Sequence, residues 1–274
     1  MPFSQNIRGT LILHACQANA SCLRMSLCQD CFSPGVTHKG TPQGKWEKIG
    51  GVDCYVGTPT ADISKDAVVL YFADLFGPQA VNAQLMVDDF ASSGFKTIAM
   101  DYFGGDPAPP DGLDEGTKFD LWGWLGRHSP NVTRPYIDKV VSALATQGVT
   151  TLYGTGYCFG GRYVFDLAFD NVLKVAVVAH PSLLEIPKDL ETYIAKSQAP
   201  LLINSCEIDP VFHLEAQAKA DEVLGSGNFK PGYKRNYFPG CSHGFAVRGD
   251  MSNPEVKAGK EGAFKATIEW FSKK

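Results

Sequence analysis

The sequence has 274 residues, of which 44% are apolar and 20% charged, and its formal net charge at pH 7 is −4. A chain of this size can bury one substantial core. The weak negative charge argues against a nucleic-acid partner, and apolar runs such as residues 67–73 have the length of a strand rather than of a membrane span. Composition therefore predicts one main domain that acts on a small molecule without a nucleic-acid or membrane partner. It leaves the oligomeric state open.

The first 40 residues are expected to form an N-terminal extension, flexible or used for targeting, before a main domain at 41–274. Residues 1–24 contain Arg8 and Arg24 but no acidic residue, which is typical of a mitochondrial presequence. Met25 offers a second start, so the segment equally fits an upstream extension with no role in the fold. We expect a cytoplasmic protein, with the mitochondrion as the alternative.

After residue 46, short β-rich runs alternate with amphipathic helical stretches. Strands are expected at 52–59, 66–73, 96–103, 150–156, 174–180, 199–206 and 233–238, and helices at 78–94, near 122, and at 134–148, 160–170, 189–196, 213–224 and 254–274. This alternation predicts an α/β fold with a mostly parallel central sheet and helices on both faces. Functional side chains are then expected at the C-terminal ends of the strands.

The segment from Gly156 to Gly160, GYCFG, joins a predicted strand to a predicted helix. It matches the glycine-x-nucleophile-x-glycine turn of many hydrolases, with Cys158 where a serine is usual. The glycines permit a sharp turn, and the start of a helix favours the thiolate. A cysteine between glycines can also be a buried structural thiol. The strand-turn-helix context favours the nucleophile.

A thiolate nucleophile needs a base, and the base needs an orienting acid. Asp209 and then His243 follow Cys158, each just past a predicted strand, in the order nucleophile, acid, histidine. Glu207 competes as the acid. His180 ends a strand but precedes the acid, so we expect it to pack near the site or line it.

Acyl transfer also needs donors for a developing oxyanion, and the backbone N–H groups of Phe159 and Leu75 are the candidates. Aromatic side chains near the strand ends could line a pocket, although most such residues are core. These aromatic residues are Tyr102, Phe103, Trp122 and Trp124.

Together, GYCFGGR, EID and SHGF resemble the dienelactone hydrolase family of the α/β-hydrolase fold, in particular its fungal branch. The resemblance covers about residue 40 to the C-terminus. It implies a Cys158, Asp209 and His243 triad that hydrolyses a lactone or small ester through an acyl-enzyme, with no metal or cofactor. A carboxylesterase acting on a secondary-metabolite ester is the alternative within the same family.

The sequence departs from the bacterial members at two places. Asp74 stands where they have a glutamate that contacts the thiol, so it either reaches Cys158 or only shapes its loop. One of the arginines that hold the substrate carboxylate in bacterial members is replaced by the Gly104–Asp106 segment. Arg248 is the surviving candidate, either binding a substrate carboxylate or lying exposed beside Asp250.

The remaining cysteines support a rival hypothesis of a different class. A thiol redox or metal-binding protein could use Cys28 and Cys31, which have a CxxC spacing, together with Cys206 and Cys241. No second CxxC or close histidine pair completes a zinc site. We therefore expect reduced thiols and no metal.

Overall fold

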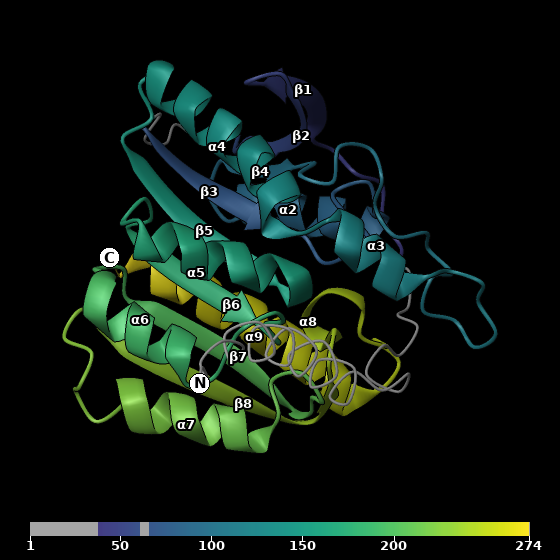
Figure 1. Ribbon diagram of the computed structural model, residues 1–274. Coiled ribbons are helices and arrows are strands. Elements are labelled where there is room, and N and C mark those ends of the chain that lie inside the picture. The colour runs from purple at the N-terminus through teal and green to yellow at the C-terminus, as the bar shows by residue number, and fades with distance from the viewer. Residues whose placement is uncertain (1–37, 61–65, 274) are drawn as a thin grey trace, which may run out of the picture.

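The computed structural model of the protein describes residues 38–60 and 66–273 (Figure 1). The expectations for residues 1–24 and for Cys28 and Cys31 lie outside this part of the chain. Residues 38–40, assigned above to the extension, contact the main domain, because the His38 backbone N–H donates to Asn82 Oδ1 at 2.8 Å.

The centre of the fold is an eight-stranded sheet with the order β1-β2-β4-β3-β5-β6-β7-β8. β1 and β2 pair antiparallel, as do β2 and β4, and every other neighbouring pair is parallel. The strands are β1 (Lys45–Ile49), β2 (Val52–Gly57), β3 (Ala67–Phe72), β4 (Thr97–Met100), β5 (Thr151–Tyr157), β6 (Val175–Ala179), β7 (Leu201–Ile208) and β8 (Tyr233–Ser242).

Helices cover both faces of the sheet, as the alternating pattern predicts (Figure 1). The helices are α2 (Val81–Ser92), α3 (Leu121–Arg127), α4 (Pro130–Thr146), the short 3-10 turn η2 (Cys158–Gly160), α5 (Gly161–Phe169), α6 (Lys188–Lys196), α7 (Leu214–Leu224), α8 (Phe245–Arg248) and α9 (Pro254–Ser272). Core residues of α3 to α7 pack on one face and those of α2, α8 and α9 on the other. None of the helices within 38–60 and 66–273 is long and apolar enough to span a membrane.

Burial on both faces explains the apolar runs. In β3, Leu70 and Phe72 pack into one core cluster, and Val69 and Tyr71 pack into the other. Successive side chains of a strand point to opposite faces, so a strand covered on both sides is apolar throughout.

The sequence did not predict β1 or α8. Four of the five residues of β1 are exposed, so this edge strand has no apolar run to mark it. α8 has only four residues, too few for a helical period. The predicted strands and longer helices are otherwise confirmed, and the C-terminal ends of β3, β5, β6, β7 and β8 converge on one edge.

Candidate active site

Cys158 lies at a strained turn immediately after β5. Its φ of +50° is uncommon for a residue other than glycine. Cys158 is the first residue of η2, and α5 follows at once. Gly160 is required here because a Cβ would overlap the Phe72 carbonyl oxygen at the end of β3. A Cβ on Gly156 would lie 2.6 Å from the Gly160 carbonyl oxygen. The glycines therefore allow the sharp turn at residues 156–160, called the elbow below, to form and to pack closely against the end of β3.

His243 and Asp209 form a buried hydrogen-bonded pair beside this elbow. His243 Nδ1 lies 3.0 Å from Asp209 Oδ1, and both side chains are almost fully buried. The same Asp209 oxygen accepts the backbone N–H groups of Val211 and Phe212 at 3.0 and 2.9 Å. Burial raises the pKa of Asp209, but His243 and then these backbone contacts outweigh it and hold the pKa below its ordinary value.

Glu207, the competing acid, faces elsewhere. It is exposed, and its Oε2 accepts the Gly240 backbone N–H at 2.7 Å. Of the two acids, Asp209 contacts His243 and Glu207 does not.

The thiol and the imidazole are electrostatically coupled. Burial raises the pKa of Cys158, but His243 and then Arg248 outweigh it, so the pKa lies below its ordinary value. Burial lowers the pKa of His243, but Asp209 and Cys158 outweigh it and raise the pKa to about 10. A thiolate beside an imidazolium is the protonation state that these shifts favour.

The segment that begins at the end of β3 and carries Leu75 lies against the turn that carries Phe159. The elbow touches the Phe72 carbonyl at the start of this loop, and Leu75 and Phe159 are both buried. Tyr102 anchors the loop through a hydrogen bond from its hydroxyl to the Ala73 carbonyl oxygen. The two candidate oxyanion donors therefore come from segments in direct contact.

Three of the four predicted aromatic residues, Tyr102, Phe103 and Trp124, pack on Phe159. The Tyr102 ring stacks on the Phe159 ring with centroids 6.1 Å apart, and Phe103 lies 5.2 Å from Phe159. Trp124 is fully buried in the same group. In this position Tyr102 and Phe103 support the nucleophile turn rather than line the pocket described below.

Asp74 and Arg248 form a buried ion pair. Arg248 Nη1 donates to Asp74 Oδ2 at 3.1 Å, while Asp74 Oδ1 accepts the Phe76 backbone N–H. Arg248 is 6% exposed, so it does not lie on the surface beside Asp250. Gly244 makes room for it, since a Cβ there would lie 2.7 Å from the guanidinium carbon.

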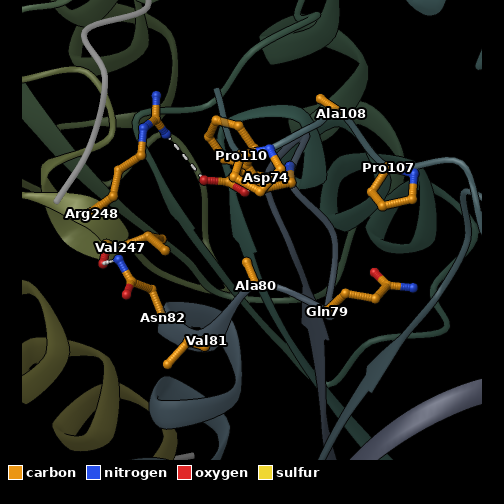
Figure 2. Close-up of a pocket in the computed structure, with 11 residues that line it drawn as sticks. Asp74, Gln79, Ala80, Val81, Asn82, Pro107, Ala108, Pro110, Val247 and Arg248 are labelled. Atoms are coloured by element: carbon orange, nitrogen blue, oxygen red, sulfur yellow. Dashed lines mark hydrogen bonds and ion pairs between the residues drawn. The ribbon is translucent and has the colours of Figure 1, made fainter. Parts of the chain in front are cut away.

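The ion pair lines a pocket of about 300 Å³, drawn in Figure 2. Most of its wall is apolar, and the lining residues are Asp74, Phe76, Gln79, Ala80, Val81, Asn82, Pro107, Ala108, Pro110, Val247 and Arg248. Nε and Nη2 of Arg248 are buried and make no hydrogen bond to any described residue. Asp74 and Arg248 also influence the pKa of Cys158, although Cys158 is not among the residues that line the pocket.

The His180 ring packs against the His243 ring. Its ring centroid is 4.9 Å from that of His243, and neither of its ring nitrogens has a hydrogen-bond partner within the described chain. Burial, followed by His243 and Arg248, holds the pKa of His180 well below its ordinary value. His180 is therefore a neutral ring packed on His243.

Sequence reasoning missed Ser182, which is buried with its Oγ 3.4 Å from Cys158 Sγ. Its position just past β6, the strand beside β5, was the available signal, because strand ends converge at the site.

The rival thiol or metal site is not assembled in the described part of the chain. Cys54, Cys158, Cys206 and Cys241 are free thiols, and no group of three or more histidine, cysteine or acidic residues there could hold a metal. Burial raises the pKa of Cys241 to about 11. Burial and Asp209 together raise the pKa of Cys206 still more. Protonated thiols are poor nucleophiles and metal ligands.

A parallel sheet with a nucleophile turn and an Asp-His pair at its C-terminal edge defines an α/β-hydrolase. Solved structures share this architecture. That of a candidate dienelactone hydrolase from Klebsiella pneumoniae matches with a TM-score of 0.67 at 19% identity, covering 86% of this chain and all of that one.

Residues 52–274 match the profile of the dienelactone hydrolase family. The hydrolase pyvD of Aspergillus violaceofuscus is 32% identical over 243 residues, 88% of this chain and 95% of that protein. Dienlactone hydrolase 1 of Gibberella moniliformis is 30% identical over 246 residues, 88% of this chain and 91% of that protein. The chain belongs to the dienelactone hydrolase family and is a carboxylic ester hydrolase.

Proposed function

We propose that the protein hydrolyses a lactone or a small ester through an acyl-enzyme on Cys158. The observation that carries this proposal is the buried His243–Asp209 hydrogen bond next to a cysteine held at positive φ. The low pKa of Cys158 and the raised pKa of His243 support it, because a thiolate attacks carbonyl carbon and a thiol does not.

In the first half-reaction, the thiolate of Cys158 attacks the carbonyl carbon and forms a carbon–sulfur bond. The carbonyl oxygen becomes an oxyanion, for which the backbone N–H groups of Phe159 and Leu75 are the donors. The carbon–oxygen bond of the ester or lactone then breaks, and His243 Nε2 gives its proton to the departing oxygen. For a lactone, that oxygen stays attached to the acyl chain.

In the second half-reaction, water attacks the thioester. His243 takes a proton from the water, the carbon–sulfur bond breaks, and Cys158 leaves as the thiolate. Asp209 holds the imidazole in one tautomer and stabilises the imidazolium in both halves, as an orienting acid does. The product is a hydroxy acid from a lactone, or an acid and an alcohol from an ester.

The pocket favours a compact substrate with an acidic group. Its apolar wall suits a small ring or chain, and Arg248 lines it. Besides Nη1, which Asp74 uses, Arg248 has two buried nitrogens without a hydrogen-bond partner among the described residues. A carboxylate can accept two hydrogen bonds from a guanidinium. Asp74 already accepts a hydrogen bond from Arg248 Nη1, so the guanidinium is ordered before substrate binds. A bulkier secondary-metabolite ester is the competing substrate class within the same mechanism.

The test is a screen of lactones and aryl esters, with and without a carboxylate and over a range of acyl sizes. The Cys158→Ala variant supplies the blank, and Cys54→Ala, which removes another buried thiol, is the matched control. Turnover that Cys158→Ala abolishes and Cys54→Ala retains supports the proposal. Equal turnover in all three proteins would refute it.

A further inference from the structure

We propose that the Ser182 hydroxyl donates a hydrogen bond to the Cys158 thiolate and is a positioning residue for the nucleophile. The two side chains meet at the end of neighbouring parallel strands, with Ser182 Oγ 3.4 Å from Cys158 Sγ. Ser182 is 8% exposed and Cys158 is 2% exposed, so this contact is shielded from solvent. The inference rests on Cys158 being the nucleophile, as proposed above.

The backbone holds Ser182 against the elbow independently of its side chain. The Ser182 N–H donates to the Cys158 carbonyl oxygen at 2.9 Å. The preceding Pro181 packs on Gly161, where a Cβ would lie 2.7 Å from the proline Cβ. The backbones of the serine and the nucleophile are therefore held together through main-chain atoms.

This placement requires unfavourable backbone conformations. His180 and Leu183, on either side of Ser182, have φ values of +37° and +63°. Neither is glycine, and a side chain makes such conformations unfavourable. Strain of this kind persists where the surrounding structure enforces it, and here it turns the chain so that Ser182 faces the thiol.

The direction of the hydrogen bond follows from protonation. A serine hydroxyl has one proton to donate, whereas a thiolate can only accept. The charged and titratable groups that act on the sulfur come from other segments: His243 after β8, Arg248 in α8, Asp74 after β3 and Tyr102 after β4. Of these, His243 gives up its proton during each turnover, while the serine keeps its own.

The strength of the hydrogen bond from Ser182 to the Cys158 sulfur changes at each stage of the reaction. It favours the thiolate before attack, weakens once the sulfur is part of an uncharged thioester, and re-forms as the sulfur departs. Ser182 therefore assists expulsion of the thiolate during deacylation. Its loss should slow deacylation more than acylation and lengthen the lifetime of the acyl-enzyme.

The test is a titration of the thiolate absorbance of Cys158, taken as the difference between each protein and the same protein carrying Cys158→Ala. Ser182→Ala should raise the apparent pKa by about one unit, a tenfold change in the ionisation constant. Ser182→Thr keeps the hydroxyl and should restore the lower value. Ser197→Ala removes a buried serine hydroxyl that accepts the Ala199 N–H, and should leave the titration unchanged.

Burst kinetics on an aryl ester supply a second readout, in which Ser182→Ala should accumulate more acyl-enzyme. An unchanged titration in Ser182→Ala, or a raised pKa that Ser182→Thr fails to reverse, would overturn the inference. The titration needs no substrate, so the two proposals can fail separately. Absence of a low-pKa thiolate in the wild-type protein contradicts both, whereas a Cys158 thiolate indifferent to Ser182 contradicts only this one.

Discussion

His243 and Asp209 are joined through their side chains and through the backbone at the ends of the two strands that precede them. The imidazole Nδ1 and the carboxylate Oδ1 are 3.0 Å apart, and the His243 backbone N–H donates to the Ile208 carbonyl oxygen at 2.8 Å. The pairing of β7 with β8 therefore extends to the residues that carry the acid and the base. This geometry is fixed before any substrate arrives.

Replacing the acid should damage turnover without abolishing it. Asp209→Asn removes the charge that stabilises the His243 imidazolium and should lower kcat/KM by about 10³- to 10⁴-fold. His243→Ala should be more damaging, because it removes the group that transfers the proton. Steady-state rates on one aryl ester measure both effects.

Glu207→Gln is the matched control for the acid. Glu207 is exposed and bonds to Gly240 rather than to the base, so its replacement should change kcat/KM by less than twofold. A larger loss in Glu207→Gln than in Asp209→Asn would show that the acid is misassigned.

Activity should persist into alkaline solution. The fraction of thiolate rises as pH rises through the pKa of Cys158, which lies below its ordinary value, and the imidazolium is lost as pH rises through about 10. A profile of kcat/KM against pH should therefore be a bell with its upper limb near pH 10. Asp209→Asn should move that limb to lower pH, since Asp209 is the main group that raises the pKa of His243. An upper limb near pH 7 in the wild-type protein would contradict this electrostatic account.

Arg248 should discriminate among substrates. Arg248→Met should lower kcat/KM roughly ten- to hundredfold on a carboxylate-bearing lactone and much less on its methyl ester. Because the substitution leaves Asp74 buried without its partner, Asp74→Asn should be combined with it to remove that destabilisation. Equal losses on acid and ester in the double variant would exclude Arg248 from substrate recognition.

Gly160 offers a test of the elbow's packing. Gly160→Ala places a Cβ against the Phe72 carbonyl oxygen and should lower the free energy of unfolding by about 1–3 kcal/mol or more. Gly126→Ala in α3 is the control, since its Cβ meets no atom within 4 Å and should stabilise by up to about 1 kcal/mol. Thermal denaturation of the two variants measures both effects, and equal melting temperatures would refute the packing argument.

Local patterns were sufficient to predict the parallel sheet and to nominate the three residues of the proposed triad. The elbow depends on glycines two residues before and after Cys158 in the sequence. Asp209 and His243 each follow a strand directly. The partners of Arg248 and Ser182 could not be predicted in this way. Arg248 meets Asp74 from a position 174 residues away, and Ser182 reaches Cys158 only because the chain turns at positive φ on either side of it. Such contacts depend on tertiary packing, which leaves no periodic signal.

The central claim is that a covalent intermediate forms on Cys158, and mass spectrometry of protein quenched during turnover tests it most directly. With a slowly hydrolysed aryl ester, the wild-type protein should gain the mass of one acyl group, located on the peptide that contains Cys158. Cys158→Ala should gain none, while Cys54→Ala should behave as the wild type. Turnover by Cys158→Ala at the wild-type rate, or an acyl group found on another residue, would contradict the account.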